Sequence, residues 1–106
     1  MSAGHVIRSR EFTAERAWGA LDIANLDGTT VRLHWTDQPY VWHVNDGREV
    51  FVVLDGAVEM RYREAGMEQR VLLGVGDIFY AEVGCEHVAH PQGAARILVV
   101  EREGSV

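Results

Sequence analysis

The chain has 106 residues, 47% of them apolar, and a formal net charge of −6, which predicts one domain over residues 1–106 with its own core. All ten basic residues are arginines, scattered along the chain, and this balance argues against nucleic acid or an anionic membrane as partner. Cys85 is the only cysteine, so no internal disulfide can form. No signal-peptide core and no run of eighteen apolar residues is seen, so we expect a cytoplasmic protein.

The first part of the chain predicts a short helical turn and then a β-hairpin. Thr13 is a suitable N-cap, which favours a single helical turn from Thr13 to Ala20. The segments Leu21–Leu26 and Thr30–Trp35 flank Asp27-Gly28, a pair typical of tight hairpin turns. In the second segment apolar residues alternate with Arg32 and His34, so the two faces of this strand differ in polarity.

The rest of the chain predicts short strands separated by glycine-containing turns. We expect strands at Val50–Leu54, Ala57–Arg63, Met67–Leu73, Ile78–Ala81, His87–His90 and Arg96–Glu101. Val50–Leu54 is apolar throughout, as is typical of a strand covered on both faces. Since strands dominate and the helical signal is weak, the sequence predicts an all-β sandwich or barrel.

Two histidines and a glutamate are candidates for one metal site. Residues two apart in a strand share a face, so His43 and Asn45 are expected to point the same way. Glu49 opens an apolar strand, where a carboxylate is costly to bury unless it is paired or binds a cation. His87 opens a later strand and, in a closed barrel, can face His43 and Glu49 across the lumen. Two imidazoles and one carboxylate leave open coordination positions on a divalent ion.

The spacing of these residues resembles the two sequence motifs of the cupin family. In the segment at about 37–56, the spacing His43-x-Asn45-x3-Glu49-x6-Gly56 is similar to the first motif. In the segment at about 76–91, the spacing Gly76-x5-Glu82-x-Gly84-x2-His87 is similar to the second motif. The resemblance covers residues 30–101. It implies a double-stranded β-helix (cupin, or jelly-roll) barrel with one divalent transition metal ion (Fe, Mn, Ni, Cu or Zn) in its mouth.

Carried over position by position, the resemblance makes His43, Glu49 and His87 metal ligands. Asn45 stands where the family has its second histidine, and an amide oxygen binds a first-row ion less tightly than imidazole, so Asn45 is expected to be weak or non-ligating. Three outcomes stay open: a working three-ligand site, a site that loses its metal on purification, or a site that holds only water. A hydrogen-bonded pair of His43 and Glu49 without an ion is the structural alternative. The chain departs from the motifs at three further positions, which affect turns and are expected to have little effect on the fold: Asp37, Glu82 and Pro91.

Other side chains near the motifs are weaker candidates for the site. His90 is expected on the surface, and Cys85 is expected to be a reduced loop cysteine rather than a nucleophile. The residues that could act as a general base, if they reach the cavity, are Tyr40, His34 and Glu82. Most of the large apolar side chains are expected in the core, with one or two forming walls of a ligand pocket: Trp35, Tyr40, Trp42, Phe51, Met60, Phe79 and Tyr80.

Two functions of different classes fit the sequence. The first is a metal-dependent oxygenase (dioxygenase-like) or isomerase acting on a small organic molecule, a choice that rests on the resemblance because a fold does not select a reaction. The second is a non-catalytic cupin that binds or senses a small molecule and has a degenerate or empty metal site. A homodimer is also expected, because open sheet edges need covering, with the N-terminal strand segment as the contact.

Overall fold

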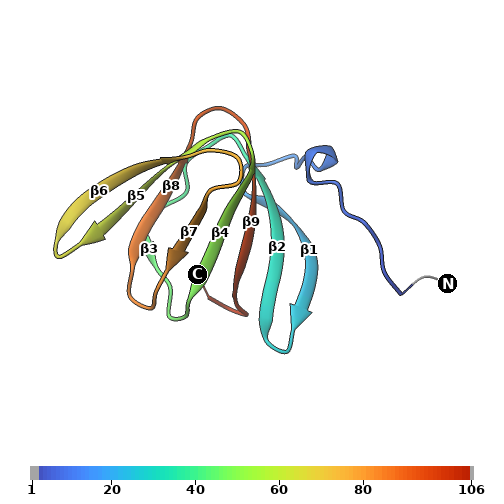
Figure 1. Ribbon diagram of the computed structural model, residues 1–106, viewed down its shortest axis with the longest axis horizontal. Coiled ribbons are helices and arrows are strands. Elements are labelled where there is room, and N and C mark those ends of the chain that lie inside the picture. Colours follow the sequence, from blue (N-terminus) through green and yellow to red (C-terminus); the bar gives the residue numbers. More distant parts are fainter. Residues whose placement is uncertain (1–2, 106) are drawn as a thin grey trace.

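The computed structural model, which describes residues 3–105, contains two antiparallel β-sheets (Figure 1). The five-stranded sheet has the order β1 (Gly19–Leu26), β2 (Thr29–Thr36), β9 (Ala95–Arg102), β4 (Glu49–Asp55) and β7 (Ile78–Ala81). The four-stranded sheet has the order β3 (His43–Val44), β8 (Glu86–Pro91), β5 (Val58–Glu64) and β6 (Met67–Leu73). The predicted strands are therefore confirmed, with ends that differ by one or two residues. The strand expected to carry His43 and Asn45 is shorter than predicted, because β3 ends at Val44. Within the described residues no helix is long and apolar enough to cross a bilayer.

The hairpin turn predicted at Asp27-Gly28 is confirmed by its backbone angles, and a turn of the same kind joins β5 to β6. Asp27 and Gly28 join β1 to β2 with φ values of 54° and 98°. Ala65 and Gly66 join β5 to β6 with φ values of 51° and 78°. Positive φ at both central residues is what a type I′ turn requires, because this turn matches the twist of the strands it joins.

The helical turn predicted from Thr13 to Ala20 is wrong. A single 3-10 turn, η1, lies earlier at Ser9–Glu11, and β1 already begins at Gly19. The chain folds back tightly before β1: Trp18 has φ 62°, and a Cβ atom on Gly19 would lie 2.3 Å from the Cβ of Ala14. Gly19 is therefore required by this close approach, and Trp18 is turned away from the direction a helix would give it.

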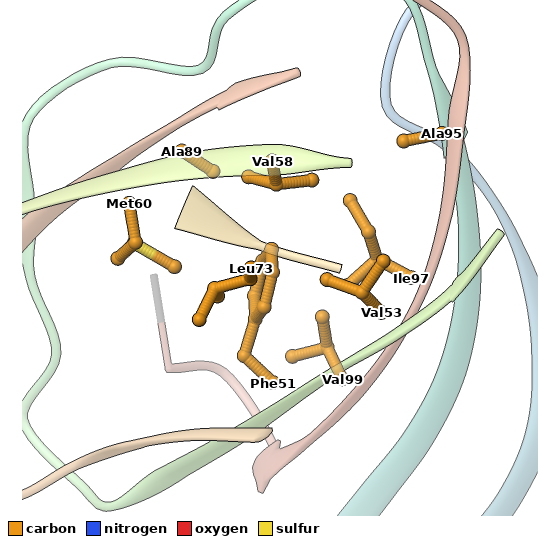
Figure 2. Packing of buried hydrophobic residues seen from close by; sticks show 9 residues of the cluster. All are labelled: Phe51, Val53, Val58, Met60, Leu73, Ala89, Ala95, Ile97 and Val99. Carbon is orange, nitrogen blue, oxygen red and sulfur yellow. The ribbon is translucent and has the colours of Figure 1, made fainter. Parts of the chain in front are cut away.

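The hydrophobic core lies between the two sheets (Figure 2). Val53 and Ile97 extend into it from the five-stranded sheet, and Val58 and Met60 from the four-stranded sheet; each of the four is 0% exposed. Phe51 and the other members of the cluster complete the packing. Along β5 the apolar side chains of Val58 and Met60 alternate with those of Glu59 and Arg61 and occupy the buried face.

The outer face of the five-stranded sheet is less covered than the sequence predicted. Val50 and Val52 are half-buried on this face, although their strand was expected to be covered on both sides. Ile78 is 62% exposed and Tyr80 is 49% exposed, so the prediction of Tyr80 as a core residue is wrong. Trp42 is also outside the core, with the guanidinium of Arg63 4.0 Å from its ring centre. The homodimer stays a prediction.

Candidate metal centre

His43, Glu49 and His87 meet inside the barrel, where the two sheets approach each other. The β3–β8 register pairs His43 directly with His87, and Glu49 enters from the first residue of β4 in the other sheet. One ligand atom from each residue lies within 4.8 Å of the other two. Glu49 and His87 are buried, and His43 is half-buried. The sequence predicted that His87 faces His43 and Glu49 across the lumen. The three side chains do meet, but His43 and His87 lie side by side on one sheet and Glu49 comes from the other.

Both histidines are held by backbone carbonyl groups. Nδ1 of His87 lies 2.9 Å from the Cys85 carbonyl oxygen, and Nδ1 of His43 lies 3.0 Å from the Val41 carbonyl oxygen. A carbonyl oxygen only accepts hydrogen bonds, so Nδ1 carries a proton in both rings. This leaves Nε2 of each ring for the interior, and a metal-binding histidine is usually oriented by such a bond from its other nitrogen.

In the protein without an ion, a proton lies between two of the three residues. Nε2 of His87 is 2.7 Å from Oε1 of Glu49. Burial alone would lower the pKa of His87, but the hydrogen bonds to Glu49 and to the Cys85 carbonyl outweigh it and raise the pKa. Burial alone would raise the pKa of Glu49, but hydrogen bonds from His87 and Glu101 lower it. A divalent cation bound here would replace the Nε2 proton of His87.

Glu101 is a member of the site that was not predicted from the sequence motifs. The β4–β9 register places Glu101 directly opposite Glu49, and the two carboxyl groups are hydrogen-bonded. Burial and the neighbouring Glu49 raise the pKa of Glu101 to about 8, so Glu101 carries a proton near neutral pH and donates it to Glu49. A signal was available: the inward positions of β9 are Ile97, Val99 and then Glu101, and a carboxylate that continues a buried apolar row needs a partner.

Asn45 is buried, with 1% of its surface exposed. It is not among the residues that line the cavity next to His43, Glu49 and His87. Its Nδ2 group donates a hydrogen bond of 3.1 Å to Oε2 of Glu101. Its Oδ1 atom has no hydrogen-bond partner among the described residues. The amide therefore supports the Glu101 carboxyl group, and this arrangement favours the alternative in which Asn45 does not bind the ion.

Glu101→Gln is expected to weaken the pH dependence of stability in the metal-free protein. The pKa of Glu101 rises from 4.5 to about 8 in the folded state, so between these values the folded chain keeps a proton that the unfolded chain has lost. This stabilisation is complete below about pH 4.5 and is lost as the pH rises through about 8, with a slope of at most about 1.4 kcal/mol per pH unit. Urea unfolding at about pH 6 and pH 8 measures the slope.

The control for this experiment is Glu103→Gln, which changes a more exposed carboxylate two residues along the chain. His87 also has a raised pKa and contributes a slope of the same sign, so the comparison between the variants isolates Glu101. Equal slopes in the wild-type protein and in Glu101→Gln would contradict the proton assignment.

The triad faces a cavity of about 230 Å³ between the sheets. Three aromatic side chains line it: Trp18, Tyr40 and Phe51. Ring centres lie 5.2 Å apart for Trp18 and Tyr40, and 5.1 Å apart for Tyr40 and His43, so the aromatic wall continues to the candidate metal ligands. Trp18 was not expected at the site, because the sequence pattern favoured a helical turn over this residue.

The weaker site candidates separate into two groups. His34 and Tyr40 line the cavity, whereas Glu82 is exposed and does not line it. Nδ1 of His34 lies 3.1 Å from the Trp18 carbonyl oxygen, and burial lowers the pKa of this imidazole. His34 is therefore neutral near pH 7, with Nε2 as a proton acceptor.

The positions of His90 and Cys85 are those expected from the sequence. His90 lies on the opposite face of β8 from His87 and does not line the cavity. Burial raises the pKa of the Cys85 thiol, which argues against a reactive thiolate at this position.

Comparison with solved structures places this architecture among the cupins. A cupin-2 domain protein from Shewanella frigidimarina is 24% identical, with a TM-score of 0.75 and 85% of each chain covered. A cupin superfamily protein from Desulfitobacterium hafniense has a TM-score of 0.78 at 12% identity, covering 96% of this chain and 93% of its own. A hydroquinone 1,2-dioxygenase in complex with Fe³⁺ has a TM-score of 0.75 at 15% identity, with 85% of this chain matched to 29% of that one.

No protein-family model matches the chain, and no curated protein matches it significantly. The structural likeness establishes the fold: this chain is a small jelly-roll β-barrel of the cupin type. The fold class predicted from the two motifs is confirmed.

Proposed function

We propose that this small cupin binds a divalent transition metal ion in the mouth of its barrel, with His43, Glu49 and His87 as ligands. The observation that carries the proposal is the convergence of three ligand atoms, from both sheets, to within 4.8 Å. Two imidazole nitrogens and one carboxylate suit Fe, Mn, Ni, Cu or Zn. Three protein ligands leave coordination positions open, and the adjoining cavity gives a small molecule access to them.

The residues around the three ligands fit this role. Nε2 of each histidine is available because Nδ1 donates to a backbone carbonyl. Glu101 donates to Glu49 and so restricts the orientation of this carboxylate. Partners that orient metal ligands in this way are worth about 10- to 100-fold in metal affinity.

We propose further that the site acts on a small organic molecule, in a dioxygenase-type or isomerase reaction. The similarity to a hydroquinone 1,2-dioxygenase in complex with Fe³⁺ supports this class. When bound, the metal supplies Lewis-acid polarisation of a substrate oxygen. The aromatic side chains Trp18, Tyr40 and Phe51 hold the substrate and exclude water. Neutral His34 can accept a proton at Nε2.

The second candidate is a binding or sensing module without catalysis. The observation that favours it is Asn45, which hydrogen-bonds Glu101 in place of acting as a fourth ligand. In this case the cavity still binds a small molecule, but the three-residue set retains metal too weakly for turnover. Metal content separates the two candidates.

Protein purified without chelators is expected to contain about one transition metal ion per chain. Removing the ion and then adding Fe(II), Mn(II), Ni(II), Cu(II) or Zn(II) should restore stoichiometric binding of at least one ion. An excess of about 100 times the dissociation constant should raise the free energy of unfolding by about 2.7 kcal/mol. Elemental analysis and thermal unfolding measure both effects. Protein that stays metal-free after dialysis against all five ions would refute the metal site and leave the binding module.

A further inference from the structure

Arg32 is the only arginine among the described residues that line the cavity. The strand registers pair Arg32 with Val99 on β9, and Val99 with Phe51 on β4. The three side chains therefore share the inner face of the five-stranded sheet. Val99 and Phe51 belong to the core. The charged side chain of Arg32 interrupts this apolar row, and packing of the core does not require a charge there.

The guanidinium of Arg32 is oriented by one neighbour. Its Nε atom donates a 2.7 Å hydrogen bond to Oδ1 of Asp22, the residue directly opposite on β1. The charge of Arg32 also acts on Glu101, but the two side chains are not hydrogen-bonded. Within residues 3–105, Asp22 is the one hydrogen-bond partner of the guanidinium, so the Nη1 and Nη2 donors are left for a ligand or water. The side chain is 40% exposed, and an ion pair this accessible contributes little to stability.

The residues that line the cavity differ in chemistry. The aromatic side chains of Trp18, Tyr40 and Phe51 form an apolar wall. The guanidinium is a planar fork that binds a carboxylate through two parallel hydrogen bonds. The volume of about 230 Å³ is below the range of about 300–1,000 Å³ typical of pockets for drug-sized ligands, so the ligand is small.

We propose that Arg32 is the anion-recognition residue of this cavity and that the ligand is a small organic carboxylate. Its charged group binds Nη1 and Nη2 of Arg32, its apolar body packs on the aromatic wall, and its remaining end faces His43, Glu49 and His87. The last of these contacts rests on the proposed function. The contact with Arg32 does not, because it requires no metal ion.

The test compares benzoate with benzamide, which has nearly the same shape and no charge, by calorimetric titration into the full chain. Benzoate is expected to bind about 10- to 100-fold more tightly, the effect of hydrogen bonds to a charged group. Arg32→Gln should abolish this preference, and Arg32→Lys, which keeps the charge but not the fork, should retain part of it. The matched control is Arg70→Gln, which removes an exposed arginine paired with Glu68 on β6, remote from the cavity, and should keep the full preference.

Metal content is measured in each sample, so that failure of this proposal and failure of the metal site are distinguishable. Loss of the benzoate preference in Arg32→Gln with unchanged metal content supports the proposal. A benzoate preference in metal-free protein also supports it, even though the metal site would then be refuted. Equal affinity for the two probes in the wild-type protein, no benzoate binding at about 10 mM, or an unchanged preference in folded Arg32→Gln would each overturn the proposal.

Discussion

His87→Ala is expected to abolish metal retention and to lower the free energy of unfolding of the metal-free protein by about 3–5 kcal/mol, the cost of breaking a buried charged pair. His87 is 1% exposed and bonds to Glu49 at 2.7 Å and to the Cys85 carbonyl at 2.9 Å. Truncation leaves Glu49 without its cationic partner in the interior and removes one of three proposed ligands. Urea unfolding and elemental analysis of the same preparation measure the two effects.

The control for His87→Ala is His90→Ala, on the same strand but on its opposite face. His90 does not line the cavity, so this variant should keep its metal and lose no more than about 1 kcal/mol, as is usual for substitutions away from buried networks. Equal destabilisation of the two variants, or full metal retention by His87→Ala, would show that His87 is not the buried ligand described above.

Glu49→Gln is expected to lower metal affinity by more than about 100-fold, which exceeds the loss typical of changes to groups that only orient a ligand. Glutamine is nearly the same size as glutamate but has no negative charge for the cation. Its carbonyl oxygen can still accept from Nε2 of His87, so the barrel should remain folded. The substitution also removes the charge that raises the pKa of Glu101, which partly offsets the lost charged pair.

His87→Ala and Glu49→Gln differ in their expected effects. His87→Ala should impair stability and metal binding together, whereas Glu49→Gln should impair mainly metal binding. Glu59→Gln is the control for charge, because Glu59 pairs with Arg61 on the four-stranded sheet and does not line the cavity. If Glu49→Gln binds metal as tightly as Glu59→Gln does, Glu49 is not a ligand.

The barrel could be predicted from the sequence because local signals agree with the fold. Asp27-Gly28 fixes a tight turn whatever its surroundings, and the alternation at Val58 and Met60 fixes which face is buried. The segment before β1 could not be predicted from local signals. Its path depends on Trp18, which lines the cavity and donates from Nε1 to the Gln38 carbonyl oxygen, a tertiary contact between segments twenty residues apart.

The three candidate ligands could be predicted because their spacing is preserved. The spacing did not reveal that Glu101 lies opposite Glu49, since their pairing depends on the register of β4 and β9, which are distant in sequence. The role of Asn45 follows from the same register, because its amide hydrogen-bonds Glu101. Where the family has its second histidine, this chain has Asn45, which hydrogen-bonds Glu101. Glu101 in turn hydrogen-bonds Glu49 and lies outside both motifs.

The most direct test of the metal site is anomalous diffraction, at the absorption edge of the metal found by elemental analysis, from crystals of protein purified without chelators. The account predicts one strong peak about 2.0–2.2 Å from Nε2 of His43, Nε2 of His87 and a carboxylate oxygen of Glu49. A crystal soaked with the metal that shows no anomalous peak among these three side chains, with Nε2 of His87 still hydrogen-bonded to Glu49, would contradict it.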